Sequence, residues 1–284
     1  MRFLLTLILV IYGTTIFAGD AEDVSVHRFN KKGEFYFYWG WNRAWYTTSD
    51  IQFTGTGYDF TLKNVIAYDR PSPFDAETYF NPAQLTIPQY NLRFGYYFKN
   101  NVSISIGTDH MKYVMRNGQH VKIDGFIENS SSAYNGIYEN EDITLSKDFL
   151  IYEHTDGLNY GNTELRHHDI LYYSSQLEIN AVEGFGVGIL YPRSNVTLLD
   201  FDRNDQFHLA GYGIDLVAAL NITFLKHFFI QPELKGGFIN MPDVKTTKNS
   251  SDKAKQHFYF TQFNVVFGVS MPLKLKSLKK ERCV

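Results

Sequence analysis

Several stretches of the chain alternate apolar and polar residues for ten or more positions, most clearly between Ala210 and Phe224. In a β-strand, successive side chains point to opposite faces of the sheet. One face of this segment is almost entirely apolar, and the other carries glycine, aspartate, asparagine and threonine. An apolar face of this kind is either covered by a second sheet or turned toward lipid. The pattern therefore predicts long antiparallel strands and leaves a soluble sandwich and a transmembrane barrel open.

The N-terminal residues Met1–Ala18 have the features of a secretory signal peptide. Arg2 supplies the positive start, Phe3–Tyr12 is an apolar run broken only by one threonine, and a small residue precedes Gly19. The run is shorter than the ~20 residues of a spanning helix, which disfavours the alternative of an uncleaved N-terminal anchor. We therefore expect the mature chain to be exported.

Composition favours the barrel over the sandwich. Aromatic residues make up 17% of the chain, including 20 Tyr and 24 Phe, which suits the aromatic girdles at the two membrane interfaces. The mean hydropathy of -0.26 does not argue against a membrane protein, because barrel strands give a weak signal per segment. The single cysteine, Cys283, excludes an internal disulfide, and a net charge of -3 gives no basic face for nucleic acid.

The connections between predicted strands fall into short turns and long polar loops, an alternation typical of periplasmic turns and extracellular loops. We predict an all-β, antiparallel, up-and-down transmembrane β-barrel of about 10–12 strands after a cleaved signal peptide. Twelve strands result if a short strand at 50–53 is counted, and ten if 120–153 forms a hairpin outside the membrane. The predicted segments are a signal peptide at 1–18, an N-terminal extension at 19–31, the barrel at 32–273 and a basic tail at 274–284. Predicted strands include Glu34–Tyr46, His120–Ile127 and His168–Val182, and predicted tight turns are Lys99–Asn101, Glu183–Gly184 and Leu225–Lys226.

Parity along the strands assigns a set of charged side chains to the lumen. Charges in a narrow lumen must pair or remain hydrated, because an isolated buried charge costs several kcal/mol. We interpret the set as a salt-bridge network that closes a small barrel; a proton or solute path is the alternative. A wide pore is disfavoured, since open channels use about 16–18 strands. The inward-facing charges are Arg93, Asp109, Glu178, Asp215, Glu233 and Lys235.

Two histidine-containing segments lie near strand ends that should face outside. The segment Glu153–Asn159 reads EHTDGLN, and it contains His154, Asp156 and Asn159. Histidine beside a carboxylate and an amide is the residue set of a hydrolase, which needs a base, an orienting acid and an oxyanion donor. These three residues are the catalytic candidates. Interfacial hydrogen bonding and packing in the aromatic girdle are the structural alternative for the histidines.

The architecture as a whole resembles that of bacterial outer-membrane β-barrel proteins. EHTDGLN also distantly resembles the His-x-Ser-Asn-Gly strand motif of outer-membrane phospholipase and lipid A deacylase barrels, which hydrolyse acyl esters of membrane lipids. The resemblance implies that His154 is the base. The position of the nucleophilic serine is occupied by Asp156, which is not an acyl nucleophile of that type. A distant serine (Ser103, Ser105 or Ser174) remains open as a substitute.

A divalent metal site at the rim is a further hypothesis. Mixtures of histidine and carboxylate suit transition metals, and Asp156 and Asn159 offer oxygen ligands for Ca²⁺. The metal candidates are Asp109, His110, His168 and Asp169, to which His154 and Asp156 add. The aromatic segment from Phe35 to Trp45 suggests a girdle strand, with sugar stacking as the alternative.

The sequence thus predicts a cell outer membrane location and a structural or interaction role. A rim-active lipid hydrolase and a small-solute channel are the rival functions, and a soluble periplasmic sandwich or lipocalin-like barrel is the rival fold. Expected partners are membrane lipids or lipopolysaccharide and an outer-membrane protein, without nucleic acid. No cofactor is expected apart from Ca²⁺ or another divalent metal at the rim.

Overall fold

The computed structural model describes residues 31–81 and 88–272. The predicted signal peptide, the basic tail and Cys283 lie outside the described residues. Nearly all of the described chain is β-structure. Its strands are β1 Glu34–Tyr46, β2 Ser49–Gly55, β3 Tyr58–Val65, β4 Ala67–Tyr68, β5 Tyr90–Tyr97, β6 Val102–Asp109, β7 Tyr113–Met115, β8 His120–Ile127, β9 Gly136–Thr144, β10 Leu150–His154, β11 Tyr160–Tyr173, β12 Leu177–Leu190, β13 Arg193–Leu198, β14 Asn204–Phe207, β15 Gly211–Phe224, β16 Phe228–Lys245 and β17 Lys253–Pro272.

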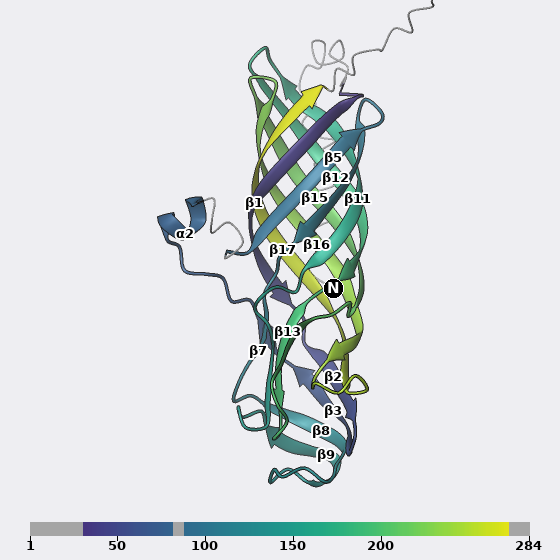
Figure 1. Ribbon diagram of the computed structural model, residues 1–284. Coiled ribbons are helices and arrows are strands. Elements are labelled where there is room, and N and C mark those ends of the chain that lie inside the picture. The colour runs from purple at the N-terminus through teal and green to yellow at the C-terminus, as the bar shows by residue number, and fades with distance from the viewer. Residues whose placement is uncertain (1–30, 82–87, 273–284) are drawn as a thin grey trace, which may run out of the picture.

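Eight strands close into an antiparallel barrel (Figure 1). They follow one another as β1, β5, β6, β11, β12, β15, β16 and β17, and pairing of β17 with β1 completes the ring. The whole sheet contains twelve strands, because β2, β3, β8 and β9 continue it from the far end of β17. The barrel predicted to have about 10–12 strands is therefore a ring of eight, and four more strands of the same sheet stand outside it. These four strands can join the sheet because β17 is 20 residues long, and its first residues extend beyond the barrel and pair with β2.

The barrel is apolar outside and polar inside. Along β15, Tyr212, Ile214 and Leu216 are about half exposed, whereas Asp215 between them is buried. Each of the eight strands shows this alternation, so the wall presents an apolar surface to its surroundings and polar side chains to its axis. A closed barrel satisfies all its backbone hydrogen bonds between strands, as a lipid environment requires. The chain is therefore a transmembrane β-barrel of the outer-membrane type, in contact with membrane lipids.

Short turns and long connections emerge at opposite ends of the barrel. Turns at 98–101, 174–176 and 225–227 share one end with the start of β1 and the end of β17. We call this the turn end; in outer-membrane barrels it faces the periplasm. The turn predicted at Glu183–Gly184 is wrong, because both residues lie within β12 and pair with β11. Gly184 is not a chain breaker here: a Cβ atom at this position would meet Arg166 Cγ at 2.9 Å, so glycine makes room for a lumen side chain.

The long connections fold into a second body, which we call the outer domain. One of its sheets is the extension formed by β2, β3, β8 and β9, and the other orders β14, β13, β10, β7 and β4. Aromatic contacts join the two sheets, with Phe53 and Tyr152 at 5.8 Å and Phe60 and Phe149 at 5.8 Å between ring centroids. These residues belong to one buried apolar cluster, which fills the outer domain and continues into the outer end of the barrel through Tyr160, Leu190, Ile239 and Phe260.

A short helix, α2 (Ala76–Phe80), projects from the side of the molecule between β4 and β5 (Figure 1). Asp75 caps its N-terminus by accepting a hydrogen bond from the Thr78 backbone N–H at 2.9 Å. Tyr79 contacts Trp41 on the outer wall, with ring centroids 5.5 Å apart. No helix in the described part of the chain is long and apolar enough to cross a membrane.

Candidate functional site

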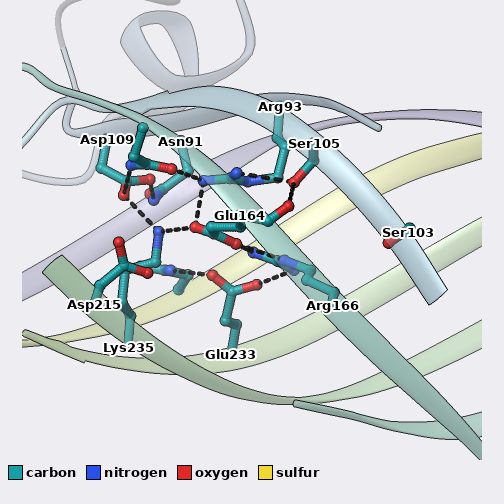
Figure 2. A network of polar contacts seen from close by, with 12 residues as sticks. Asn91, Arg93, Ser103, Ser105, Asp109, Glu164, Arg166, Asp215, Glu233 and Lys235 are labelled. Atoms are coloured by element: carbon teal, nitrogen blue, oxygen red, sulfur yellow. Dashed lines mark hydrogen bonds and ion pairs between the residues drawn. The ribbon is translucent and has the colours of Figure 1, made fainter. Parts of the chain in front are cut away.

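The centre of the barrel is occupied by a network of buried charges (Figure 2). Glu164, on β11, lies at its middle. One carboxylate oxygen contacts Arg93 Nη2 at 2.5 Å and Lys235 Nζ at 2.8 Å, and the other contacts Arg166 at 2.6 Å. All four side chains are at most 2% exposed. One carboxylate therefore holds three cations that come from β5, β11 and β16.

Two further carboxylates extend the network along the axis. Asp109, on β6, accepts a hydrogen bond from Lys235 Nζ at 2.5 Å, and Glu233, on β16, contacts Arg166 Nη1 at 2.8 Å. Neutral groups satisfy the remaining donors. Arg93 and Arg166 each donate to the Tyr38 hydroxyl at 2.9 Å. Three cations thus face three carboxylates in a hydrogen-bonded network that ties opposite walls together.

The arrangement stabilises a closed lumen. A buried ion group is retained only where the attraction and the added hydrogen bonds offset desolvation, and here every charge has several partners. An interior of eight strands is just wide enough for side chains to fill. At the turn end, a cavity of about 10 Å³ lies beside Lys31, Tyr36 and His168, which is room for one water molecule. Side chains thus fill the lumen at its centre.

The other two predicted lumen charges lie apart from this centre. Asp215 faces inward on β15 and accepts a hydrogen bond from the Tyr160 hydroxyl at 2.8 Å. Its second carboxylate oxygen is buried without a hydrogen bond in the described structure. Glu178 lies near the turn end, where it pairs with Lys31 at 2.8 Å. The structure therefore gathers Arg93, Asp109, Glu233 and Lys235 and leaves these two at the margins.

The sequence prediction missed Glu164 and Arg166, which are the centre of the network. The predicted strand began at His168, whereas β11 begins at Tyr160. The missed signal was the alternation of Asn162, Glu164 and Arg166 with outward Thr163 and Leu165. It was weak because the outward face of β11 is itself partly polar, through Thr163 and His167.

The predicted catalytic residues do not converge. His154 is fully buried in the core of the outer domain, packed against Tyr113 and Tyr152 with ring centroids at 5.6 and 5.1 Å. Neither ring nitrogen has a hydrogen bond in the described structure, and burial lowers the pKa of His154 to about 3. Without a serine or a carboxylate at hydrogen-bond distance, this histidine cannot act as the base of a hydrolase.

Asp156 and Asn159 have other partners. Asp156 forms an ion pair with Arg193 at 3.1 Å. Asn159 Oδ1 lies 2.8 Å from His110 Nδ1. Of the serines left open as substitutes, Ser103 meets His168 instead, at 3.1 Å in the lumen, beside a cavity too small for an ester substrate. The three residues proposed for the hydrolase site are therefore not brought together. They are close in the chain but not in space, because β10 ends at His154 and the residues after it turn to other partners.

The predicted metal residues are also divided. Asp109 belongs to the lumen network, and His110 at the outer end of β6 stacks on Tyr90, with centroids 4.9 Å apart. His168 lies at the turn end, where its backbone N–H donates to the Asn101 carbonyl, and Asp169 points outward beside His167. These groups occupy opposite ends of the barrel, so they cannot share one ion. Asp156 and Asn159 likewise point to different partners, which removes the support for a Ca²⁺ site.

No family model matches the sequence, and no curated protein matches it. Solved structures with a similar fold are outer-membrane proteins. OprG from Pseudomonas aeruginosa is 11% identical with a TM-score of 0.41, and the alignment covers 87% of this chain and 99% of that one. AlkL, whose structure was determined in DMPC bilayers, is 9% identical over 86% and 93%, with a TM-score of 0.39. Ail of Yersinia pestis is 10% identical over 84% and 99%, with a TM-score of 0.31. At identities and TM-scores this low, the functions of those proteins have no bearing on this chain.

Proposed function

We propose that this protein is a non-conducting outer-membrane barrel that anchors a folded interaction domain at the cell surface. The observation that carries the proposal is the lumen network around Glu164, which crosses the axis and leaves its cations at most 2% exposed. A barrel closed in this way has no path for ions or solutes through its centre. The barrel then serves as a rigid membrane anchor for the outer domain.

The outer domain supports the second half of the proposal. Its two sheets and the apolar core between them hold a surface in a fixed shape, which mobile loops would not do. The four strands of the extension sheet carry six Asp or Glu and two Lys, so this sheet is acidic. On its outward face, Phe126 and Ile137 pair across β8 and β9 and are 37% and 74% exposed.

Apolar side chains within a charged rim are typical of protein contact surfaces. The acidic rim repels the negatively charged phosphates of lipopolysaccharide and attracts a protein partner with a basic surface. The functional surface is therefore the face around Phe126 and Ile137, and the partner is a cationic protein of the cell surface or its surroundings.

Two measurements test the proposal. In planar bilayers, the purified protein should show no stepwise conductance; steps that change on Glu233→Gln or Asp215→Asn would overturn the closed-barrel half. For the interaction half, a photoreactive amino acid at position 137 should give a discrete protein adduct on intact cells. The same group at position 212, on the lipid-facing wall, is the control. The adduct should weaken with added salt and with Glu139→Gln combined with Glu141→Gln. Equal labelling at both positions would contradict an interaction surface.

A further inference from the structure

Three ionisable side chains interrupt the apolar outer wall of the barrel toward its turn end. His167 and Asp169 come from β11, and Glu183 comes from β12 directly opposite His167. Alternation along both strands places them on the outward face, between inward Arg166, His168 and Val182. They belong neither to the lumen network nor to the outer domain.

The neighbours of this cluster are apolar. Leu165 and Phe185 precede it on the side of the outer domain, each about half exposed, and Leu171 follows it on the side of the turn. Ala218 on β15 faces Glu183 across the next pair of strands. Ionisable groups that face lipid are costly and are a sign of function by default. Two carboxylates in such a place need a compensating charge.

The ligand atoms of the three residues converge on one point. All lie within 4.8 Å of one another. His167 Nδ1 is 3.3 Å from Asp169 Oδ2 and 3.8 Å from Glu183 Oε1, yet it is shielded from solvent and makes no hydrogen bond in the described structure. The nitrogen is aimed at the carboxylates without a proton-sharing geometry, as a ligand atom would be.

Asn101 orients the imidazole from the other side. The side-chain amide nitrogen Nδ2 lies 2.7 Å from His167 Nε2. In that orientation the amide donates to Nε2 and the ring proton sits on Nδ1. Metal binding through Nδ1 requires the amide to turn by 180°, so that Nε2 donates to Oδ1 and Nδ1 keeps its lone pair for a ligand bond. Metal-binding histidines regularly hold their second nitrogen in this way.

We propose that His167, Asp169 and Glu183 bind a divalent transition-metal ion such as Zn²⁺ on the lipid-facing wall. Two carboxylates carry two negative charges, which a divalent ion balances and a single imidazolium does not. The imidazole ligand favours zinc and its neighbours over Ca²⁺ and Mg²⁺, which prefer oxygen alone. Three protein ligands leave one tetrahedral position for water. Asn101 is a positioning residue.

The test uses the full mature chain, without a histidine tag, folded in detergent and freed of metal with a chelator. Zinc binding is measured by titration calorimetry and by metal content after gel filtration, with Mg²⁺ in excess. Variants are Asp169→Asn combined with Glu183→Gln, and Asn101→Ala. The control is His208→Asn, in the outer domain. His208 pairs with Asp243 at 2.8 Å and is therefore a histidine–carboxylate pair away from the proposed site. The shift of the folded band on heating confirms that each variant is folded.

We expect one zinc ion per chain. The double variant should lose the site, and Asn101→Ala should weaken it about 10- to 100-fold, as loss of an orienting partner does. The His208→Asn control should bind as the wild type does. Absence of stoichiometric zinc, or a site that survives in the folded double variant, would overturn the proposal. Loss of zinc in the control would assign the ion to the outer domain and overturn it equally.

Discussion

At the scale of single residues, the stability of the folded barrel depends on Glu164. Its carboxylate faces Arg93, Arg166 and Lys235, all fully buried and all within 2.8 Å. Removing it leaves three cations with two carboxylates in a medium that does not hydrate them. Buried ion groups are strongly destabilised when one partner is lost, by about 3–5 kcal/mol.

We therefore expect Glu164→Ala to lower the temperature at which the folded barrel converts to the unfolded form, measured by gel mobility after heating. Glu139→Ala, on the exposed edge strand β9, is the matched control and should leave this temperature unchanged. Equal behaviour of the two variants would show that the network contributes little to stability.

His154 predicts a dependence of the outer domain on pH. Burial lowers its pKa in the folded protein to about 3, against 6.5 for the free side chain. Below pH 6.5 His154 binds a proton in the unfolded state but not in the folded state. The free energy of unfolding therefore decreases as the pH falls. The loss is about 1.4 kcal/mol per pH unit and ends near pH 3.

Urea unfolding of the outer domain, followed by near-ultraviolet circular dichroism at pH 7.5, 5.5 and 4.5, measures this loss. His154→Phe should remove the steepest part of the pH dependence, since phenylalanine fills the same site among Tyr113 and Tyr152 without titrating. A variant that retained the wild-type slope between pH 6.5 and 4.5 would assign the dependence to other groups.

At the scale of elements, strands with one consistent face were predictable. The bounds of Glu34–Tyr46 and His120–Ile127 are those of β1 and β8, because alternation there is unbroken. Around 174–184 the prediction misplaced a turn, because Gly184 was interpreted as a breaker. In a lumen this narrow, glycine is a packing residue, and period-two patterns do not distinguish the two uses.

Gly107 on β6 tests this packing role. A Cβ atom there would lie 2.6 Å from the Leu92 carbonyl oxygen and 3.1 Å from Arg93 Cζ, so the backbone or the guanidinium must move. We expect Gly107→Ala to destabilise the barrel by about 1–3 kcal/mol, the usual cost of overpacking. In the same heating assay, Gly136→Ala on β9 should be neutral, since its nearest neighbour is 3.8 Å away. Equal effects would refute the packing argument.

At the scale of the whole molecule, the barrel and the outer domain are stabilised mainly by different interactions. The barrel has its ring of eight strands and the charge network, and the outer domain has the apolar cluster around Phe53, Phe60 and Tyr152. Replacing 47–89, 110–159 and 191–210 by short turns should therefore leave a folded barrel. The expected result is a band that still shifts on heating and an unchanged effect of Glu164→Ala. Failure of this shortened chain to fold would mean that the outer domain is needed to close the barrel.

The sequence by itself determined the class of the protein and the side of the wall on which most residues lie. Alternation of period two, aromatic content and short turns between long strands are local properties, so they can be read along the chain. The inward position of Arg93, Asp109, Asp215, Glu233 and Lys235 followed from parity alone.

Only the tertiary structure decided which of these groups meet and how many strands close the ring. Closure depends on the register between β1 and β17, which are more than 200 residues apart, and no local pattern encodes it. The same holds for His154, whose neighbours in the chain suggested catalysis and whose neighbours in space are tyrosines. It also holds for the cluster of His167, Asp169 and Glu183, because the pairing of β11 with β12 brings its two strands together.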